Sequence, residues 1–146
     1  MTWTDSSTEL FDGLVALVPE FRPILADHLA WTDGELLTVL LGAEFGEFIV
    51  YALTGRATAE MHGLVPGIRA RDPDLLRRIS TVLERWAEDE NPSVHADVLG
   101  TGVLETDLVR YGTELLRIAG PALVARMRTY VPWVFGGWHG APRGPA

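Results

Sequence analysis

Apolar residues recur at helical spacing near the start of the chain. The members of this first stripe are Leu10, Phe11, Leu14, Leu17 and Val18. Residues 6–9 (Ser-Ser-Thr-Glu) have the form of a capping box, in which a hydroxyl and a carboxylate bind free amides of a first helical turn. Pro19 follows, and proline inside a helix removes a hydrogen bond. We therefore predict a first helix that starts at the capping box and ends before Pro19.

A second stripe leads into the most apolar part of the chain. Its members are Phe21, Ile24, Leu25, His28 and Leu29. Residues 32–35 (Thr-Asp-Gly-Glu) repeat the capping-box pattern, so we expect a new helix to begin there and to continue to Leu53. Gly42 and Gly46 are expected to divide this stretch. It also contains Glu44 and Glu47, whose charges are costly in hydrocarbon, so it predicts a buried element and no membrane span.

The clearest helical pattern follows a connector at residues 54–71. Asp72-Pro73 combines a helix-capping residue with a proline at the first helical position. The stripe after it consists of Leu75, Leu76, Ile79, Val82, Leu83 and Trp86. Asn91-Pro92 repeats this start signal, so we predict two antiparallel helices from Asp72 to Thr106, similar in length to one HEAT-like repeat.

The remaining pattern is also helical. Two further stripes, broken at Gly120-Pro121, lead to Val131, and no segment shows the alternation typical of a β-strand. We therefore predict an all-α fold, an irregular bundle of six or seven short helices with a HEAT-like helical hairpin. Residues 1–135 are expected to form one helical domain, and residues 136–146, rich in Gly and Pro, a flexible tail.

Composition and charge limit the classes of partner that we expect for this chain. The 146 residues are 47% hydrophobic, which is ample for a core, and 20 acidic against 12 basic residues give a net charge of -8. An anionic surface repels phosphate backbones and anionic lipids, so we expect no nucleic acid or membrane partner and favour a basic protein. The start of the chain carries no pattern of a secretory signal, and the cytoplasm is the expected location. All basic residues are Arg, which hints at a GC-rich bacterial genome.

Most catalytic patterns are missing. The chain has no Cys, which excludes disulfides, thiolate zinc sites and a Cys nucleophile. Its four histidines lack metal-ligand spacing to carboxylates, and His28 is interpreted as a hydrogen-bonded core or boundary residue. Residues 100–102 (Gly-Thr-Gly) are interpreted as a close helix approach, since a phosphate loop needs a preceding strand and a following Lys. We assign no catalytic residue, cofactor or metal.

Acidic residues gather around the predicted hairpin. Glu84, Glu88, Asp89 and Glu90, with Asp97 and Glu105 on the following helix, are the candidate partner-binding residues. One anionic face of this kind would speed the encounter with a basic protein and discriminate against other partners. The alternative is an ordinary solvated helix end.

A second candidate site lies in the apolar stretch. Glu44 and Glu47 are three residues apart, so on a helix both carboxylates share one face near buried surroundings. With Phe45, Phe48 and Tyr51 they are the candidate residues of a ligand-binding pocket. The alternative is that both acids belong to a first helical turn and point to solvent.

Aromatic residues are concentrated near the C-terminal end of the sequence. Tyr130, Trp133, Phe135 and Trp138 are typical of interface anchors, and a homodimer through this region is one hypothesis. Packing of these rings within the chain is the alternative.

Three segments together resemble a short bacterial domain family of unknown function, similar to immunity-type proteins of polymorphic toxin systems. They are residues 10–29, residues 33–37 (Asp-Gly-Glu-Leu-Leu) and residues 98–105 (Val-Leu-Gly-Thr-Gly-Val-Leu-Glu). The resemblance covers about residues 8–120 and brings no functional residues. It implies a non-enzymatic immunity or antitoxin-type inhibitor that covers a basic toxin. The alternative function is a small enzyme or ligand-binding protein with Glu44 and Glu47 as polar groups.

Overall fold

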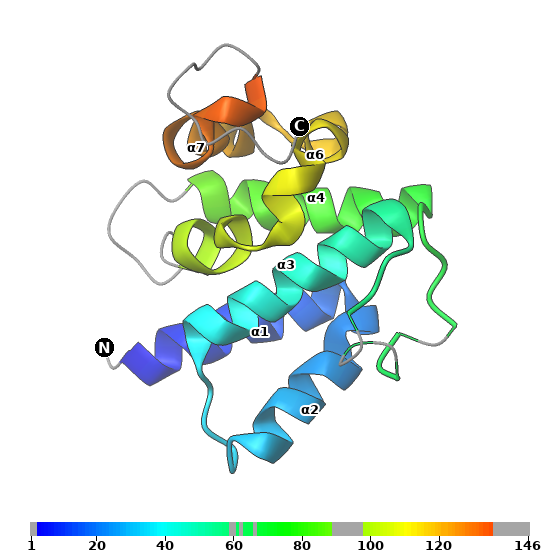
Figure 1. The fold of residues 1–146 in the computed structure, drawn as a ribbon. Coiled ribbons are helices and arrows are strands. Elements are labelled where there is room, and N and C mark those ends of the chain that lie inside the picture. The colour runs from blue at the N-terminus through cyan, green and yellow to red at the C-terminus, as the bar shows by residue number, and fades with distance from the viewer. Residues whose placement is uncertain (1–2, 59–60, 62, 66, 89–97, 136–146) are drawn as a thin grey trace.

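The computed structural model confirms an all-α fold, and it describes residues 3–58, 61, 63–65, 67–88 and 98–135. The α-helices are α1 (Trp3–Leu17), α2 (Arg22–Trp31), α3 (Thr38–Thr54), α4 (Pro73–Glu88), α6 (Gly112–Ile118) and α7 (Pro121–Tyr130). Short helical turns are η1 (Pro19–Phe21), η2 (Val98–Gly102), η3 (Val103–Glu105), η4 (Asp107–Tyr111) and η5 (Pro132–Phe135). These elements form an irregular bundle, without a strand among the described residues (Figure 1).

Helix α3 crosses the middle of the molecule. In Figure 1, α1 and α2 lie on one side of it and α4, α6 and α7 on the other. Phe45 of α3 packs edge to face on Phe21 and Trp86, with ring centroids 5.3 Å and 5.5 Å apart. Trp86 in turn meets Phe11 of α1 at 6.2 Å. These buried aromatic contacts join α1, η1, α3 and α4 into one core, because large rings bury more apolar surface than other side chains.

Two predicted helix starts are wrong. Helix α1 begins at Trp3, before the capping box at residues 6–9, and therefore includes that box. Helix α3 begins at Thr38, because residues 32–34 form a turn in which Asp33 and Gly34 adopt φ of 55° and 82°. A residue with left-handed backbone interrupts a right-handed helix, so the Thr-Asp-Gly-Glu sequence closes α2 and does not open α3.

Helix α3 is continuous through Gly42 and Gly46, which corrects the prediction that they divide it. Both glycines lie where another segment passes very close. A Cβ at Gly42 would be 2.8 Å from Val98 Cγ1, and one at Gly46 would be 2.9 Å from the carbonyl oxygen of Val103. Gly102 meets the backbone of Gly42 and completes this close approach, as predicted from residues 100–102.

The predicted hairpin is described in part. Helix α4 agrees with its predicted start and buries the stripe that includes Leu75, Ile79 and Leu83. Residues 89–97, which hold the predicted turn and the start of the second helix, lie outside the described residues. Where the chain is described again, η2 is a π-helical turn followed by the 3-10 turns η3 and η4 in place of a regular α-helix.

Long-range polar contacts attach both ends of α4 to the rest of the bundle. Near its start, the Arg78 guanidinium donates to both carboxylate oxygens of Glu20 at 2.7 Å and 2.6 Å and to the carbonyl oxygen of Leu17. Near its end, Glu84 accepts hydrogen bonds from the N–H groups of Ala122 and Leu123 at 2.6 Å and 3.0 Å. Glu84 thereby takes the place of a capping side chain for α7, whose own N-cap residue is Gly120.

The buried apolar residues from Leu10 to Val131 form one cluster. The predicted tail, residues 136–146, lies outside the described part of the chain. Within the part that is described, no helix has both the length and the apolar character that a membrane crossing requires.

Candidate functional site: a pocket between α2 and α3

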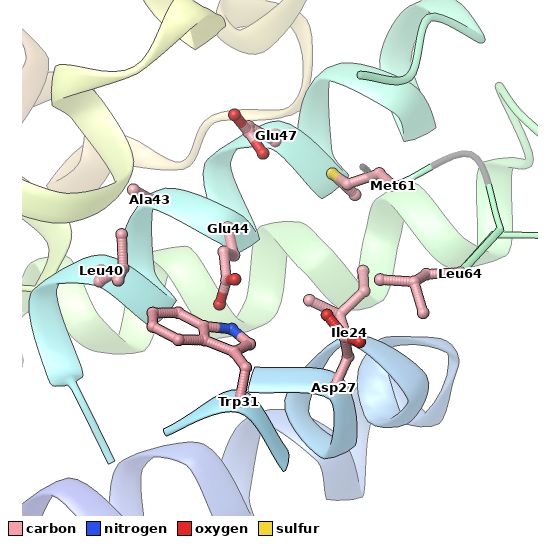
Figure 2. A pocket seen from close by; sticks show the side chains of 9 residues that line it. All are labelled: Ile24, Asp27, Trp31, Leu40, Ala43, Glu44, Glu47, Met61 and Leu64. Atoms are coloured by element: carbon pink, nitrogen blue, oxygen red, sulfur yellow. The ribbon is translucent and has the colours of Figure 1, made fainter. Parts of the chain in front are cut away.

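A pocket of about 390 Å³ opens between α2, α3 and the connector after α3 (Figure 2). Its lining residues are Ile24, Asp27 and Trp31 of α2, Leu40, Ala43, Glu44 and Glu47 of α3, and Met61 and Leu64 of the connector. Pockets of about 300–1,000 Å³ lined by apolar side chains with a few polar groups are typical of ligand sites. The volume and lining therefore suit a bound group of small-molecule size.

Helical periodicity explains how the lining residues meet. Asp27 and Trp31 are four residues apart on α2, and Glu44 and Glu47 are three apart on α3, so each pair lies on one helix face. The Glu44 carboxyl points toward Trp31, whereas that of Glu47 points away from it (Figure 2). Both acids line the pocket, in agreement with the predicted common helix face, but their carboxyls point in different directions.

A buried histidine holds Glu44. Nδ1 of His28, a residue with no exposed surface, lies 2.9 Å from Oε2 of Glu44. Nε2 of the same ring accepts the N–H of Leu37 at 3.1 Å. Because Nε2 accepts, a neutral ring carries its proton on Nδ1, and this N–H donates a hydrogen bond to Glu44. His28 is thus the hydrogen-bonded core residue that its position on the α2 stripe predicted.

Burial changes the protonation of this pair. Desolvation, with the neighbouring charge of Asp27 as a smaller cause, raises the pKa of Glu44 from 4.5 to about 7. Desolvation also lowers the pKa of His28 below its usual 6.5, although the charge of Asp27 opposes this. Near neutral pH the imidazole is therefore uncharged, and the Glu44 carboxyl changes charge readily when another charge enters the pocket.

The mouth of the pocket exposes large apolar side chains. Trp31 is 56% exposed and Leu40 43%, and Val39 beside Leu40 is 39% exposed. The Trp31 ring packs edge to face on His28, with centroids 5.4 Å apart. This contact fixes one edge of the indole while leaving much of its surface to solvent. An exposed tryptophan next to carboxylates suits a cationic group, which is attracted both by acids and by an aromatic face.

The ionisable side chains that line the pocket are all acidic among the described residues. Its ionisable lining groups are the three carboxyls of Asp27, Glu44 and Glu47. Both nitrogens of His28 are engaged in hydrogen bonds, so the ring is not free to accept a substrate proton. Among the described residues no group of three or more His, Asp or Glu side chains is arranged to hold a metal ion. Three carboxyls at one pocket are suited to attract a positively charged group.

The aromatic residues predicted for this pocket lie elsewhere. Phe45 and Phe48 have no exposed surface and belong to the core, because they occupy the face of α3 turned toward Phe21. Tyr51 is half-buried, and its hydroxyl donates to the carbonyl oxygen of Ile68 at 2.8 Å. Glu44 and Glu47 therefore line the pocket, whereas Phe45, Phe48 and Tyr51 do not.

The acidic surface predicted at the hairpin is only partly described. Glu84 is partly buried and caps α7, so it is not an open surface charge, whereas Glu88 is exposed in the last turn of α4. Asp89, Glu90 and Asp97 lie outside the described residues, as does the side chain of Glu105. The partner-binding role of these four residues stays a prediction.

The C-terminal aromatic residues have different surroundings. The Tyr130 side chain is 41% exposed and its ring lies over Gly100. The Phe135 ring lies 4.3 Å from the Arg128 guanidinium and packs against the core. The side chain of Trp133, and Trp138 as a whole, lie outside the described part, so the homodimer hypothesis stays a prediction.

Sequence reasoning missed the α2 side of the pocket. Asp27 and Trp31 flank His28, and their i, i+4 spacing places them on one face. Likewise, Leu40 lies four residues before Glu44 on α3. These spacings are visible in the sequence, but pairing the two faces requires the turn at residues 32–34 that brings α2 beside α3.

No protein-family model, curated protein or solved structure matches the chain.

Proposed function

We propose that this chain is a non-enzymatic binding protein that receives a cationic group in the α2–α3 pocket. The observation that carries the proposal is the Glu44 carboxyl, fixed by buried His28 and directed toward exposed Trp31. A bound guanidinium or ammonium group would neutralise this acid where burial otherwise disfavours its charge.

The surroundings supply the remaining recognition elements. Asp27 adds negative potential at the same pocket, and the chain as a whole carries a net charge of -8. Both attract cations and raise the rate of encounter. Ile24, Met61 and Leu64 line the apolar part, which suits the hydrocarbon stem of an arginine, a lysine or an organic amine.

A basic protein is the source of this cation that we favour. Trp31 and Leu40 at the pocket, and Val39 next to Leu40 in the chain, are exposed apolar side chains, and exposed apolar side chains are typical of an interface with a protein. In this arrangement an arginine or lysine of the partner enters the pocket while these apolar side chains pack on its neighbours. An immunity or antitoxin-type inhibitor that acts in the bacterial cytoplasm on a basic toxin is the specific function proposed.

A free organic amine is the second candidate, favoured by the volume of about 390 Å³. The two sources share the same chemistry at Glu44 and Trp31, but they differ in the use of the exposed apolar side chains. A small amine would occupy the pocket alone, whereas a protein partner would also bury Val39.

Calorimetric titration with N-acetylarginine methylamide and with phenethylamine tests the pocket directly. We expect binding of a cation to weaken about tenfold or more in Glu44→Gln, in line with the loss of one charge-assisted hydrogen bond. Trp31→Ala is expected to weaken it as well. Glu35→Gln is the matched control, because Glu35 is exposed and does not line the pocket. Equal affinity in all four proteins would refute a cation site.

Affinity purification from the native host with wild-type, Glu35→Gln, Trp31→Ala and Val39→Asp baits distinguishes the two sources. A basic protein that is recovered in equal amount with the wild type and with Glu35→Gln, but lost with Trp31→Ala and Val39→Asp, supports the protein partner. Cation binding in calorimetry without such a protein, and unchanged by Val39→Asp, favours the free amine.

A further inference from the structure

A second pocket, of about 310 Å³, lies at the other end of α3. It is lined by Leu53, Thr54, Arg71, Leu76, Glu114, Arg117 and Ile118. These residues come from the end of α3, the connector before α4, the first turns of α4, and α6. The pocket shares no residue with the one between α2 and α3.

Three charged side chains line this pocket without neutralising one another. Arg71 and Arg117 belong to separate segments, and Glu114 lies one turn before Arg117 on α6. No ion pair or side-chain hydrogen bond joins any of the three to another residue in the described part of the chain. By contrast, Arg77 and Arg78 a short distance along α4 are both paired with Asp74. The pocket therefore presents two cations and one anion to whatever enters it.

The backbone at Arg71 is fixed in an unusual conformation. Arg71 has a φ of 61°, a left-handed value that costs free energy in any residue with a Cβ. Its N–H donates to the carbonyl oxygen of Ala52 at 2.7 Å, which attaches the connector to the last turn of α3. Glycine or asparagine would adopt this conformation more easily. Arg71 therefore places an arginine side chain at the pocket from a backbone conformation that other residues adopt more easily.

The other lining groups are apolar or already engaged. Leu53, Leu76 and Ile118 form an aliphatic surface. The Thr54 hydroxyl donates to the carbonyl oxygen of Val50 at 2.7 Å and accepts the N–H of Arg56 at 3.1 Å. Recognition of a ligand therefore depends on the two guanidiniums, the Glu114 carboxylate and the aliphatic surface.

We propose that this pocket binds an α-amino acid with an apolar side chain, through Arg71 and Arg117 on its carboxylate and Glu114 on its ammonium group. Arginine is the side chain best suited to carboxylates, because its planar fork of N–H donors matches both oxygens. The aliphatic surface of Leu53, Leu76 and Ile118 takes the apolar side chain of the ligand. The inference goes beyond the cation site, and either one stands without the other.

Methyl NMR titration of the full chain with L-leucine, leucinamide and N-acetylleucine tests it. Leucinamide lacks the carboxylate and N-acetylleucine lacks the ammonium group. We expect L-leucine to shift the methyl signals of Leu53, Leu76 and Ile118 and to leave those of Leu40 and Leu64 in the other pocket unchanged. We expect each analogue to bind about tenfold more weakly or worse. No saturable shift with millimolar L-leucine, or equal affinity for all three probes, would overturn the proposal.

Matched variants assign the roles. Arg71→Asn keeps a residue that tolerates the left-handed backbone, so the variant is expected to fold, and Arg117→Gln and Glu114→Gln are close in shape to the wild type. Each should weaken L-leucine binding about tenfold or more, whereas Arg85→Gln, an exposed arginine of α4 outside this pocket, should not. Unchanged binding in Arg71→Asn and Arg117→Gln, or binding in Glu114→Gln that still discriminates against N-acetylleucine, would contradict the assigned contacts.

Discussion

His28 and Glu44 are hydrogen-bonded over 2.9 Å, with the imidazole fully buried and the carboxyl at the edge of a pocket. The second ring nitrogen binds the N–H of Leu37, the residue directly before α3. One ring of α2 therefore fixes both the start of α3 and a carboxyl in its second turn. This arrangement makes the stability of the fold and the charge of the pocket depend on the same pair.

The pH dependence of stability is expected to change in Glu44→Gln. The pKa of Glu44 is raised from 4.5 to about 7. The stability that its protonated carboxyl contributes to the fold is therefore fully present below pH 4.5 and is lost as the pH rises through 7. Glutamine stays neutral, and its carbonyl oxygen can still accept a hydrogen bond from Nδ1–H of His28. We expect the variant to be more stable than the wild type by about 1–2 kcal/mol at pH 8, after allowance for the water-facing part of the carboxyl. Urea unfolding at pH 5 and pH 8 measures this, and a difference that is equal at both pH values would contradict it.

His28 is expected to titrate below its usual pKa of 6.5 and to carry its proton on Nδ1. Protonation places a hydrogen on Nε2 and breaks the bond from Leu37. The pKa of His28 is lower in the folded state than in the unfolded state. The stability that the neutral, hydrogen-bonded ring contributes is therefore fully present above pH 6.5 and is lost as the pH falls through the folded-state pKa. Nitrogen-15 NMR of the imidazole reports both tautomer and pKa. A folded-state pKa above that in urea would show the sign to be wrong.

Alanine is expected to have opposite effects at two kinds of glycine. At Gly46 the new methyl group would lie 2.5 Å from Thr106 Oγ1 and 2.9 Å from the Val103 carbonyl oxygen, so Gly46→Ala should destabilise by about 1–3 kcal/mol. At Gly13, inside α1 with nothing within 4 Å, alanine should stabilise by about 0.5–1 kcal/mol through helix propensity. Chemical unfolding of the two variants provides the test, and a stabilised Gly46→Ala would mean that η2 and η3 do not pack as closely as the geometry requires.

Glu84→Gln is expected to lower the free energy of unfolding by about 1–2 kcal/mol, because its charged carboxylate caps two amides of α7. Hydrogen exchange should accelerate at Ala122 and Leu123. Glu88→Gln is the control, since Glu88 is an exposed acid of the same helix and its substitution should have an effect within about 0.5 kcal/mol. Equal effects of the two variants would argue that Glu84 acts only as a surface charge.

The sequence predicted the fold class and helix α4 well, because Asp72-Pro73 and the apolar stripe after it give the same local answer. The starts of α1 and α3 were predicted wrongly, since a Ser-Ser-Thr-Glu or Thr-Asp-Gly-Glu pattern is compatible with more than one backbone path. Left-handed φ values at Asp33 and Gly34 decide the path in the second case. Local sequence does not determine them without the packing of α2 on α3.

The sequence predicts the two acids that α3 contributes to the candidate site, but not the residues from α2. The spacing of Glu44 and Glu47 indicates one helix face, and both line the pocket. Their aromatic neighbours were assigned to the same site because the sequence shows which residues are near in the chain and not which face meets the core. Trp31 belongs to another helix, and its place in the site follows from the tertiary arrangement alone.

The cap that α4 supplies to α7 has a consequence for how related sequences can vary. A Cβ at Gly120 would lie 2.5 Å from the carboxyl carbon of Glu84, so the two positions share one small volume. A larger residue at 120 requires a shorter acid, such as aspartate, at 84, or a serine or aspartate at 120 that caps α7 locally and releases position 84 from this role. We therefore expect positions 84 and 120 to co-vary among homologues, although 36 positions separate them in the sequence.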